Sequence, residues 1–247
     1  MIIEIENFGK FDTSKPLSIA LPLTNDNQNP RAWYVEAPII EPVKGDGFVG
    51  TVAQGGSVNF RNISFNPHGH GTHTECLGHI TNEVYSVNQC LKEYFFNAVL
   101  VTIKPAELDG DLVITKALLE EKLKGIASIE ALIIRTIPNE EEKKHRNYSA
   151  SNPPYLHIDC IDLFNKIDVQ HLLIDTPSVD REEDGGVLAF HHAFWKVPEN
   201  PQFHKTITEL VFVENEIQDG NYLLELQIAA FENDASPSRP TLYKPIK

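Results

Sequence analysis

Asn97-Ala-Val-Leu-Val-Thr-Ile103 is an uncharged, mostly apolar run that predicts a buried strand, and it decides the fold class. Further buried strands are predicted at residues 130–136 and 170–175. Residues 115–125 favour a helix between the first two strands, and residues 158–167 favour a helix before the third. Strands that alternate with helices in this way are typical of an α/β domain.

The chain on either side of this centre is richer in strands than in helices. Alternating or apolar runs predict four more strands, at residues 17–23, 58–65, 207–213 and 221–230. Residues 24–47 are rich in Asn, Pro and Gly and predict a long loop, whereas the charged residues 138–154 predict an exposed loop. We therefore predict one α/β domain over residues 1–247, with a central mixed β-sheet flanked by helices.

Composition excludes several classes of partner. The 247 residues carry a net charge of -14 with His counted neutral, which argues against nucleic acid and against anionic membranes. No apolar run is long enough to span a bilayer. The three cysteines, Cys76, Cys90 and Cys160, are too few and too scattered to predict a disulfide framework, and the first residues lack the features of a signal peptide. We expect a cytoplasmic protein.

Residues 66–79, Asn-Pro-His-Gly-His-Gly-Thr-His-Thr-Glu-Cys-Leu-Gly-His, form a dense cluster of histidines. On an extended strand His73 and Glu75 point to the same face, so both can grip one ion. Gly69 and Gly71 allow the chain to turn and aim another histidine at the same point. Imidazole and carboxylate ligands suit Zn²⁺, Mn²⁺ or Fe²⁺. The cluster predicts a site for a divalent metal; the alternative is a surface loop that happens to be rich in histidine.

Several motifs, spread over almost the whole chain, resemble the cyclase family of metal-dependent hydrolases, which includes bacterial kynurenine formamidases. They occur in the family's order. The motifs are Asp12-Thr-Ser-Lys-Pro-Leu17, Gly71-Thr-His-Thr-Glu75 followed by His79, Arg135-Thr136, Asp175-Thr-Pro-Ser-Val-Asp180 and Asp234-Ala-Ser-Pro-Ser-Arg239. The resemblance implies the cyclase-like swivelling β/β/α architecture and a catalytic centre that holds one or two divalent ions, zinc first and manganese second.

The resemblance also implies which residues of the cluster are ligands. His73 matches the second histidine of the family signature, and Glu75 stands where the family has Asp. The family's first histidine falls at position 69, which is Gly here. If Gly69 is an extra, bulged residue, His68 recovers the required side and is the expected ligand, with His70 as the alternate.

A histidine and a glutamate far downstream complete the ligand set that the resemblance implies. His191 fits the family context better than its neighbour His192, which stays the alternate. Glu209 is preferred over Glu214 from its interval to the following glycine. Glu209 is expected to share a strand face with Ile207 and Val211, where a carboxylate would need a cation; a solvent-facing glutamate is the other interpretation.

By the same resemblance His79 is the expected acid/base catalyst, although a further ligand or a structural histidine remains open. Trp33 and Tyr34 are candidates for an aromatic wall against the substrate, or else anchors of their loop. We expect a hydrolase that cleaves a formamide or cyclic amide with metal-activated water. A lactone hydrolase or a dehydratase-type cyclase is the alternative, as is a metal-dependent small-molecule-binding protein that has lost catalysis. The expected partners are a small-molecule substrate and further copies of the chain, as a dimer or tetramer, with neither nucleic acid nor membrane.

Overall fold

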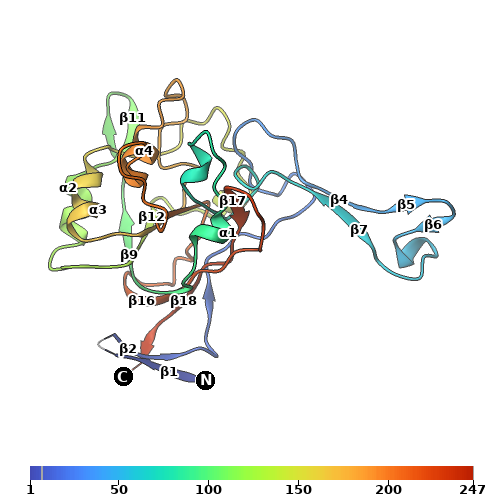
Figure 1. The fold of residues 1–247 in the computed structure, drawn as a ribbon, viewed down its shortest axis with the longest axis horizontal. Coiled ribbons are helices and arrows are strands. Elements are labelled where there is room, and N and C mark those ends of the chain that lie inside the picture. The colour runs from blue at the N-terminus through green and yellow to red at the C-terminus, as the bar shows by residue number, and fades with distance from the viewer. Residues whose placement is uncertain (7, 247) are drawn as a thin grey trace.

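A mixed sheet runs through the protein in this computed structural model, which describes residues 1–6 and 8–246 (Figure 1). The strands follow the order β17-β8-β15-β14-β12-β9-β16-β18-β3 across the sheet. In that order they are Ala235–Pro237, His73–Glu75, Thr206–Glu209, His171–Ile174, Ala131–Thr136, Phe95–Ile103, Gly220–Glu225, Thr241–Tyr243 and Leu17–Ser18.

The centre of the sheet is parallel and both flanks are antiparallel. Strands β15, β14, β12 and β9 run parallel, while β8 and β17 on one side and β16, β18 and β3 on the other are antiparallel to their neighbours. Parallel strands need both faces covered. Along β12, Leu132 and Ile134 pack into one core cluster and Ala131 and Ile133 into another on the opposite face. The predicted mixed α/β sheet is confirmed, whereas the number of domains stays a prediction.

Besides α1 (Val87–Cys90), which contributes Val87, three short helices supply side chains to the first of these two clusters. They are α2 (Lys116–Lys122), α3 (Cys160–Lys166) and α4 (Ala189–Trp195). The sequence predicts α2 and α3 but not α4, which begins after Leu188 without a side-chain cap. Phe190, Phe194 and Trp195 of α4 are buried, so aromatic packing rather than a capping signal holds this helix in place. Among the described residues, no helix combines the length and apolar character that crossing a bilayer requires.

The remaining elements are small and lie around this sheet. They are β1 (Ile2–Ile5), β2 (Gly9–Asp12) and β19 (Pro245–Ile246) in one sheet; β10 (Ala106–Leu108), β11 (Asp111–Ile114) and β13 (Tyr155–Leu156) in another; the helix α1 (Val87–Cys90); and the 3-10 turns η1 (Val52–Gln54), η2 (Leu77–His79) and η3 (Glu141–Lys144).

Residues 39–64 form a ribbon that projects from the body, and we call this segment the arm (Figure 1). It contains the pairs β4 (Ile39–Pro42) with β7 (Arg61–Ser64) and β5 (Lys44–Gly45) with β6 (Phe48–Val49). The predicted loop at 24–47 is therefore partly wrong, since it includes two strands. The predicted strand at 58–65 exists in part as β7, but it belongs to the arm and not to the central sheet.

The predicted exposed loop at residues 138–154 is also partly wrong, because Lys143 and Tyr148 are buried. The Lys143 ammonium donates to the Thr136 carbonyl at 2.7 Å and to Asp175 Oδ2 at 2.8 Å. A buried cation needs a partner of this kind. The pair fixes the loop across the ends of β12 and β14, next to the segment that carries Ser178 and Asp180.

Candidate metal centre

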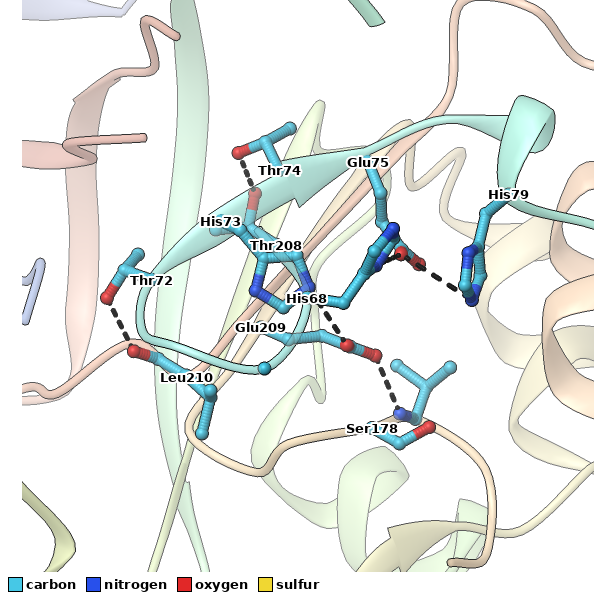
Figure 2. Close-up of polar contacts among 12 residues, drawn as sticks. His68, Thr72, His73, Thr74, Glu75, His79, Ser178, Thr208, Glu209 and Leu210 are labelled. Atoms are coloured by element: carbon cyan, nitrogen blue, oxygen red, sulfur yellow. Dashed lines mark hydrogen bonds and ion pairs between the residues drawn. The ribbon is translucent and has the colours of Figure 1, made fainter. Parts of the chain in front are cut away.

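Strand register brings the histidine cluster against Glu209. In the antiparallel pair of β15 with β8, Glu209 lies opposite His73 and Ile207 lies opposite Glu75. Opposite residues of an antiparallel pair share a face, and alternation puts His73 and Glu75 on that same face. On the other face Thr74 and Thr208 hydrogen-bond through their hydroxyls at 2.8 Å, which holds the register (Figure 2).

Glu209 is aimed into the centre by the way β15 ends. Its Oε2 lies 3.4 Å from His73 Nε2, and its Oε1 accepts the Val179 N–H at 3.0 Å (Figure 2). The next residue, Leu210, adopts a left-handed conformation with φ 54°, and Val211 then packs into the core cluster on the opposite face of the sheet. The expectation that Glu209 and Val211 share a strand face is therefore wrong, because the strand does not continue past Glu209.

His191 reaches the same point from helix α4. Its Nε2 lies 3.1 Å from Glu75 Oε1 and 3.8 Å from Glu209 Oε1. Its other ring nitrogen lies 2.6 Å from Asp180 Oδ2, and Asp180 also accepts the backbone N–H groups of Phe190 and His191. Asp180 thus fixes the orientation of the ring. His192 points elsewhere, with its Nδ1 3.3 Å from the Val197 carbonyl, so the structure brings His191 and not His192 to the cluster.

His68 reaches the cluster from the turn that precedes β8. Its Nδ1 lies 3.0 Å from Glu75 Oε2 and its Nε2 lies 2.8 Å from Asp234 Oδ2. A Cβ on Gly69 would lie 2.7 Å from a methyl group of Val35 and 3.1 Å from the Ala32 carbonyl oxygen, so a side chain at position 69 would require Val35 to move. His70 turns away, with its Nε2 2.6 Å from the Glu36 carbonyl.

His79 stands at the open side of the cluster. It lies at the end of η2, its ring stacks on that of His68 at a centroid distance of 4.2 Å, and 31% of its side chain is exposed. Its Nε2 is 4.0 Å from Glu75 Oε2 (Figure 2). Its Nδ1 lies closer to a carboxylate, 3.3 Å from Asp234 Oδ2. Asp234 therefore holds the rings of both His68 and His79.

Asp180 and Asp234 are the two site residues to which the sequence analysis gives no role. Both lie within motifs that carry the family resemblance, so the motifs themselves could have marked these two aspartates as site residues. In the sequence, one loop separates Asp180 from His191, whereas most of the chain separates Asp234 from His68 and His79. Residue spacing alone therefore does not connect an aspartate with its histidine.

The centre combines four carboxylates with four histidines, and their mutual contacts shift the pKa values. Burial disfavours the charged ring of His68, but its contacts with Asp234 and Glu75 raise its pKa to about 10. His191 is likewise buried, and its contacts with Asp180 and Glu75 raise its pKa to about 10. Burial opposes ionisation of Glu75 too, yet the surrounding histidines hold its pKa well below the usual range. In the absence of a metal ion, protons on His68 and His191 therefore supply the positive charge that a bound ion would otherwise supply.

The surroundings of two buried atoms in the cluster indicate whether a cation fits there. Among the described residues neither His73 Nε2 nor Glu75 Oε2 makes a hydrogen bond of good geometry, although both atoms are buried; their polar neighbours are Glu209 Oε2 at 3.4 Å and His68 Nδ1 at 3.0 Å. Buried polar atoms are rarely left in this state. Ligand atoms of His73, Glu75 and Glu209 lie within 4.8 Å of one another, and those of His68, Glu75 and His79 do so as well. The donor set fits a divalent ion with nitrogen and oxygen ligands, and Glu75 belongs to both groups.

A cavity of about 240 Å³ opens onto this cluster. Its lining comprises Trp33, Asn66, His68, His79, Ser178, Arg181, Glu182, Asp184, Leu188, His191 and Glu209. Trp33, one of the two predicted aromatic contacts, is thus part of the wall. Tyr34 is 64% exposed and is not among the lining residues. Both residues have φ 59° in one tight turn, and Trp33 also packs against the buried cluster of Ala32, Tyr148 and Leu210.

Comparisons with known proteins agree with the fold and the motifs. Kynurenine formamidase of Bacillus cytotoxicus is 27% identical over 228 residues, 92% of this chain and 96% of that protein. Kynurenine formamidase of Bacillus anthracis is 26% identical over 232 residues, 93% of this chain and 98% of that protein.

Solved structures match over nearly the whole length as well. Isatin hydrolase A from Labrenzia aggregata matches with a TM-score of 0.66 and 14% identity, covering 94% of each chain. A structure described as a novel cyclase matches with a TM-score of 0.67 and 16% identity, covering 95% of this chain and 90% of that one. The family model described as "Putative cyclase" matches residues 12–181. The resemblance is confirmed, and the chain belongs to this cyclase family.

Proposed function

We propose that the protein is a metal-dependent hydrolase that cleaves the amide bond of a small formamide or cyclic amide. One observation carries the proposal: ligand atoms of the buried residues His73, Glu75 and Glu209 converge within 4.8 Å of one another, in a cluster that opens onto a cavity beside His79. The names of the curated relatives and of the isatin hydrolase agree with amide hydrolysis.

His73, Glu75 and Glu209 would hold the ion, with His68 and His191 completing the set around Glu75. Such an ion polarises a carbonyl group and acidifies water, and either Zn²⁺ or Mn²⁺ suits these ligands. Because Glu75 faces both groups of ligands, the centre has room for one or two ions.

The protein's own residues supply proton transfer and orientation. His79 is held by Asp234 through Nδ1, which leaves Nε2 free to pass a proton to the departing nitrogen. Asp180 keeps Nε2 of His191 directed at Glu75. The indole of Trp33 offers an apolar wall for a flat substrate, and the cavity volume suits a small molecule.

The test is a metal analysis followed by a substrate screen. Protein purified without chelators is expected to hold about one or two equivalents of divalent ion. N-formyl arylamines and cyclic amides are then compared with lactones, before and after removal of the metal. Metal-dependent cleavage of an amide supports the proposal. Cleavage of lactones alone favours the lactone hydrolase, whereas full metal content without turnover on any of these classes favours a binding protein.

A further inference from the structure

Two of the three cysteines meet beside the metal centre. Cys76 directly follows Glu75, and Cys90 ends the short helix α1. Both are free thiols whose side chains hydrogen-bond to one another, and Cys90 packs against the core cluster to which Cys76 belongs. The third cysteine, Cys160, lies on α3 with its Sγ 3.4 Å from the Ile114 carbonyl oxygen. The pair of Cys76 with Cys90 has no role in the proposed hydrolysis, although it adjoins the strand that carries Glu75.

The chain between the two cysteines is already folded into a closed loop. Cys76 Sγ lies 3.3 Å from the Tyr85 carbonyl oxygen. A Cβ on Gly78 would lie 2.1 Å from that same oxygen, so a side chain at position 78 would push the two ends of the loop apart. The Thr81 hydroxyl donates to the Leu77 carbonyl at 3.2 Å across the loop. The fold therefore holds the two sulfur atoms in contact, which is the first requirement for a disulfide.

Cys90 is the accessible member of the pair. It is half-buried, whereas Cys76 has no exposed surface. Cys90 also lines two cavities of about 250 and 300 Å³, through which a small oxidant can reach its sulfur. The hydrogen bond from Cys76 lowers the pKa of the Cys90 thiol against the opposing effect of burial, and the charge of Lys92 lowers it further. Because the thiolate is the reactive form of cysteine, Cys90 is the sulfur that an oxidant meets first.

We propose that Cys76 and Cys90 form a redox-active pair that a hydroperoxide converts to a disulfide. With hydrogen peroxide, the Cys90 thiolate attacks one oxygen; an S–O bond forms, the O–O bond breaks, and the departing hydroxide takes up a proton to leave as water. The Cys76 sulfur then attacks the sulfenic acid of Cys90. The S–S bond forms, the S–O bond breaks, and a second water leaves with the thiol proton of Cys76. The two sulfur atoms lose two electrons in total, and the peroxide gains them.

The disulfide would restrain the segment that carries His79. The loop from Cys76 to Cys90 contains His79, at the end of η2. The Cys76 N–H donates to the Asp234 carbonyl at 3.0 Å, and the Asp234 carboxylate lies against the His79 ring. A cross-link between the two ends of this loop removes conformational freedom from the chain that it encloses. The oxidation state of the pair would therefore regulate how firmly His79 is held at the open side of the centre.

Thiol counting and peptide mapping on the full chain test the proposal without a variant. Fully reduced protein is treated with millimolar hydrogen peroxide and then unfolded in excess N-ethylmaleimide. The number of alkylated cysteines is expected to fall from three to one, and to return to three after dithiothreitol. A protease that cuts after glutamate separates the two cysteines at Glu83, giving peptides 76–83 and 84–93. These two peptides are expected to stay joined until they are reduced.

The variants Cys90→Ser and Cys160→Ser form a matched pair. Cys90→Ser is expected to keep both of its remaining thiols after peroxide, whereas Cys160→Ser is expected to lose both of its own. Hydrogen exchange reports the effect on the loop: amides of residues 77–86 are expected to exchange more slowly in the oxidised than in the reduced wild type, and at equal rates in treated and untreated Cys90→Ser.

Three outcomes would overturn the proposal. They are a wild type that keeps three thiols, a disulfide that involves Cys160 or joins two chains, and oxidation of Cys90 to a sulfinic acid without a link to Cys76. A disulfide between Cys76 and Cys90 that leaves exchange across residues 77–86 unchanged would overturn its regulation of the His79 segment.

Discussion

Glu209 lies directly across from His73 in the pairing of β15 with β8, with its carboxylate oxygen 3.4 Å from the imidazole Nε2. The two residues are far apart in the sequence, and the ladder of backbone hydrogen bonds sets their distance. The second oxygen of Glu209 is occupied by the Val179 N–H. Glu209 therefore divides its two oxygens between holding a loop and facing the proposed ion.

The variant Glu209→Gln separates these two functions. The amide oxygen still accepts from Val179, but the negative charge is lost, so the fold is retained while metal binding weakens. Zinc affinity is expected to fall at least about a hundredfold, the upper range for residues that only support a ligand. At a fixed excess of zinc, the rise in Tm caused by the metal should shrink by roughly 5–10 °C.

Titration calorimetry and thermal melts, with and without zinc, measure this effect. Glu107→Gln, on the exposed strand β10, is the matched control and should leave zinc affinity unchanged. Unaltered zinc affinity in Glu209→Gln would remove this residue from the ligand set.

The variants His79→Ala and His73→Ala are expected to differ in metal content, because His79 is proposed as a catalyst and His73 as a metal ligand. His79→Ala should keep the metal but lose turnover by on the order of a hundredfold to ten-thousandfold in kcat, because acid–base catalysis is removed. His73→Ala should lower metal occupancy and thermal stability together. Metal content and kcat are measured on the same preparations. Loss of metal from His79→Ala would make His79 a ligand, and full activity would exclude it as the catalyst.

Asp180→Asn tests how His191 is positioned. The amide keeps the size of the side chain but removes the charge that faces Nδ1 of the ring and accepts two backbone N–H groups. We expect zinc affinity to fall by about 10- to 100-fold, as for other groups that orient a metal-bound histidine. Asp184→Asn, at the rim of the same cavity, is the control. Equal zinc affinities in the two variants would show that Asp180 does not orient the ligand.

His171 predicts a loss of stability in mild acid. It is buried on β14 with its Nδ1 2.9 Å from the Thr206 hydroxyl, and burial lowers its pKa to about 3. A base with a depressed pKa in the folded state stabilises the protein above the unfolded pKa of about 6.5 and loses this contribution as pH falls toward 3. At pH 5 the cost is about 2 kcal/mol relative to pH 7.

Urea unfolding of the metal-free protein at pH 7 and pH 5 measures this cost. His171→Gln does not titrate in this range, so its free energy of unfolding should change less between the two pH values. His68 and His191 act in the opposite direction, because their pKa values are raised, but they contribute equally to both proteins. The difference between wild type and variant isolates His171, and equal pH dependence would contradict the assignment.

The central strands could be predicted because they are buried on both faces, and burial on both faces requires a nearly continuous run of apolar residues. Residues 130–136 are apolar and uncharged apart from the ends, and β12 is buried along its whole length. The arm was not predictable in the same way. An alternating strand such as 58–65 normally turns one face to the core, whereas β7 is exposed on both faces. Periodicity indicates a strand but not the sheet to which it belongs.

Much of the site was predictable from the family resemblance. The resemblance implied His73, Glu75, His191 and Glu209 as one set, and the structure places these four side chains together. The preference for His68 over His70 rested on a supposed bulge at Gly69; in the structure His68 reaches Glu75, whereas His70 turns to the Glu36 carbonyl. The contacts of Asp234 depend on the pairing of β17 with β8, for which the local sequence gives no signal.

The position of β8 between β15 and β17 has a consequence for protein synthesis. His73 and Glu75 leave the ribosome early, but both strands that flank them belong to the last fifth of the chain. During translation β8 has no sheet to join until β15, which ends at residue 209, has emerged. The centre is therefore expected to assemble only after β15 has been synthesised, and a ribosome-bound chain truncated before β15 should not capture zinc in the native manner.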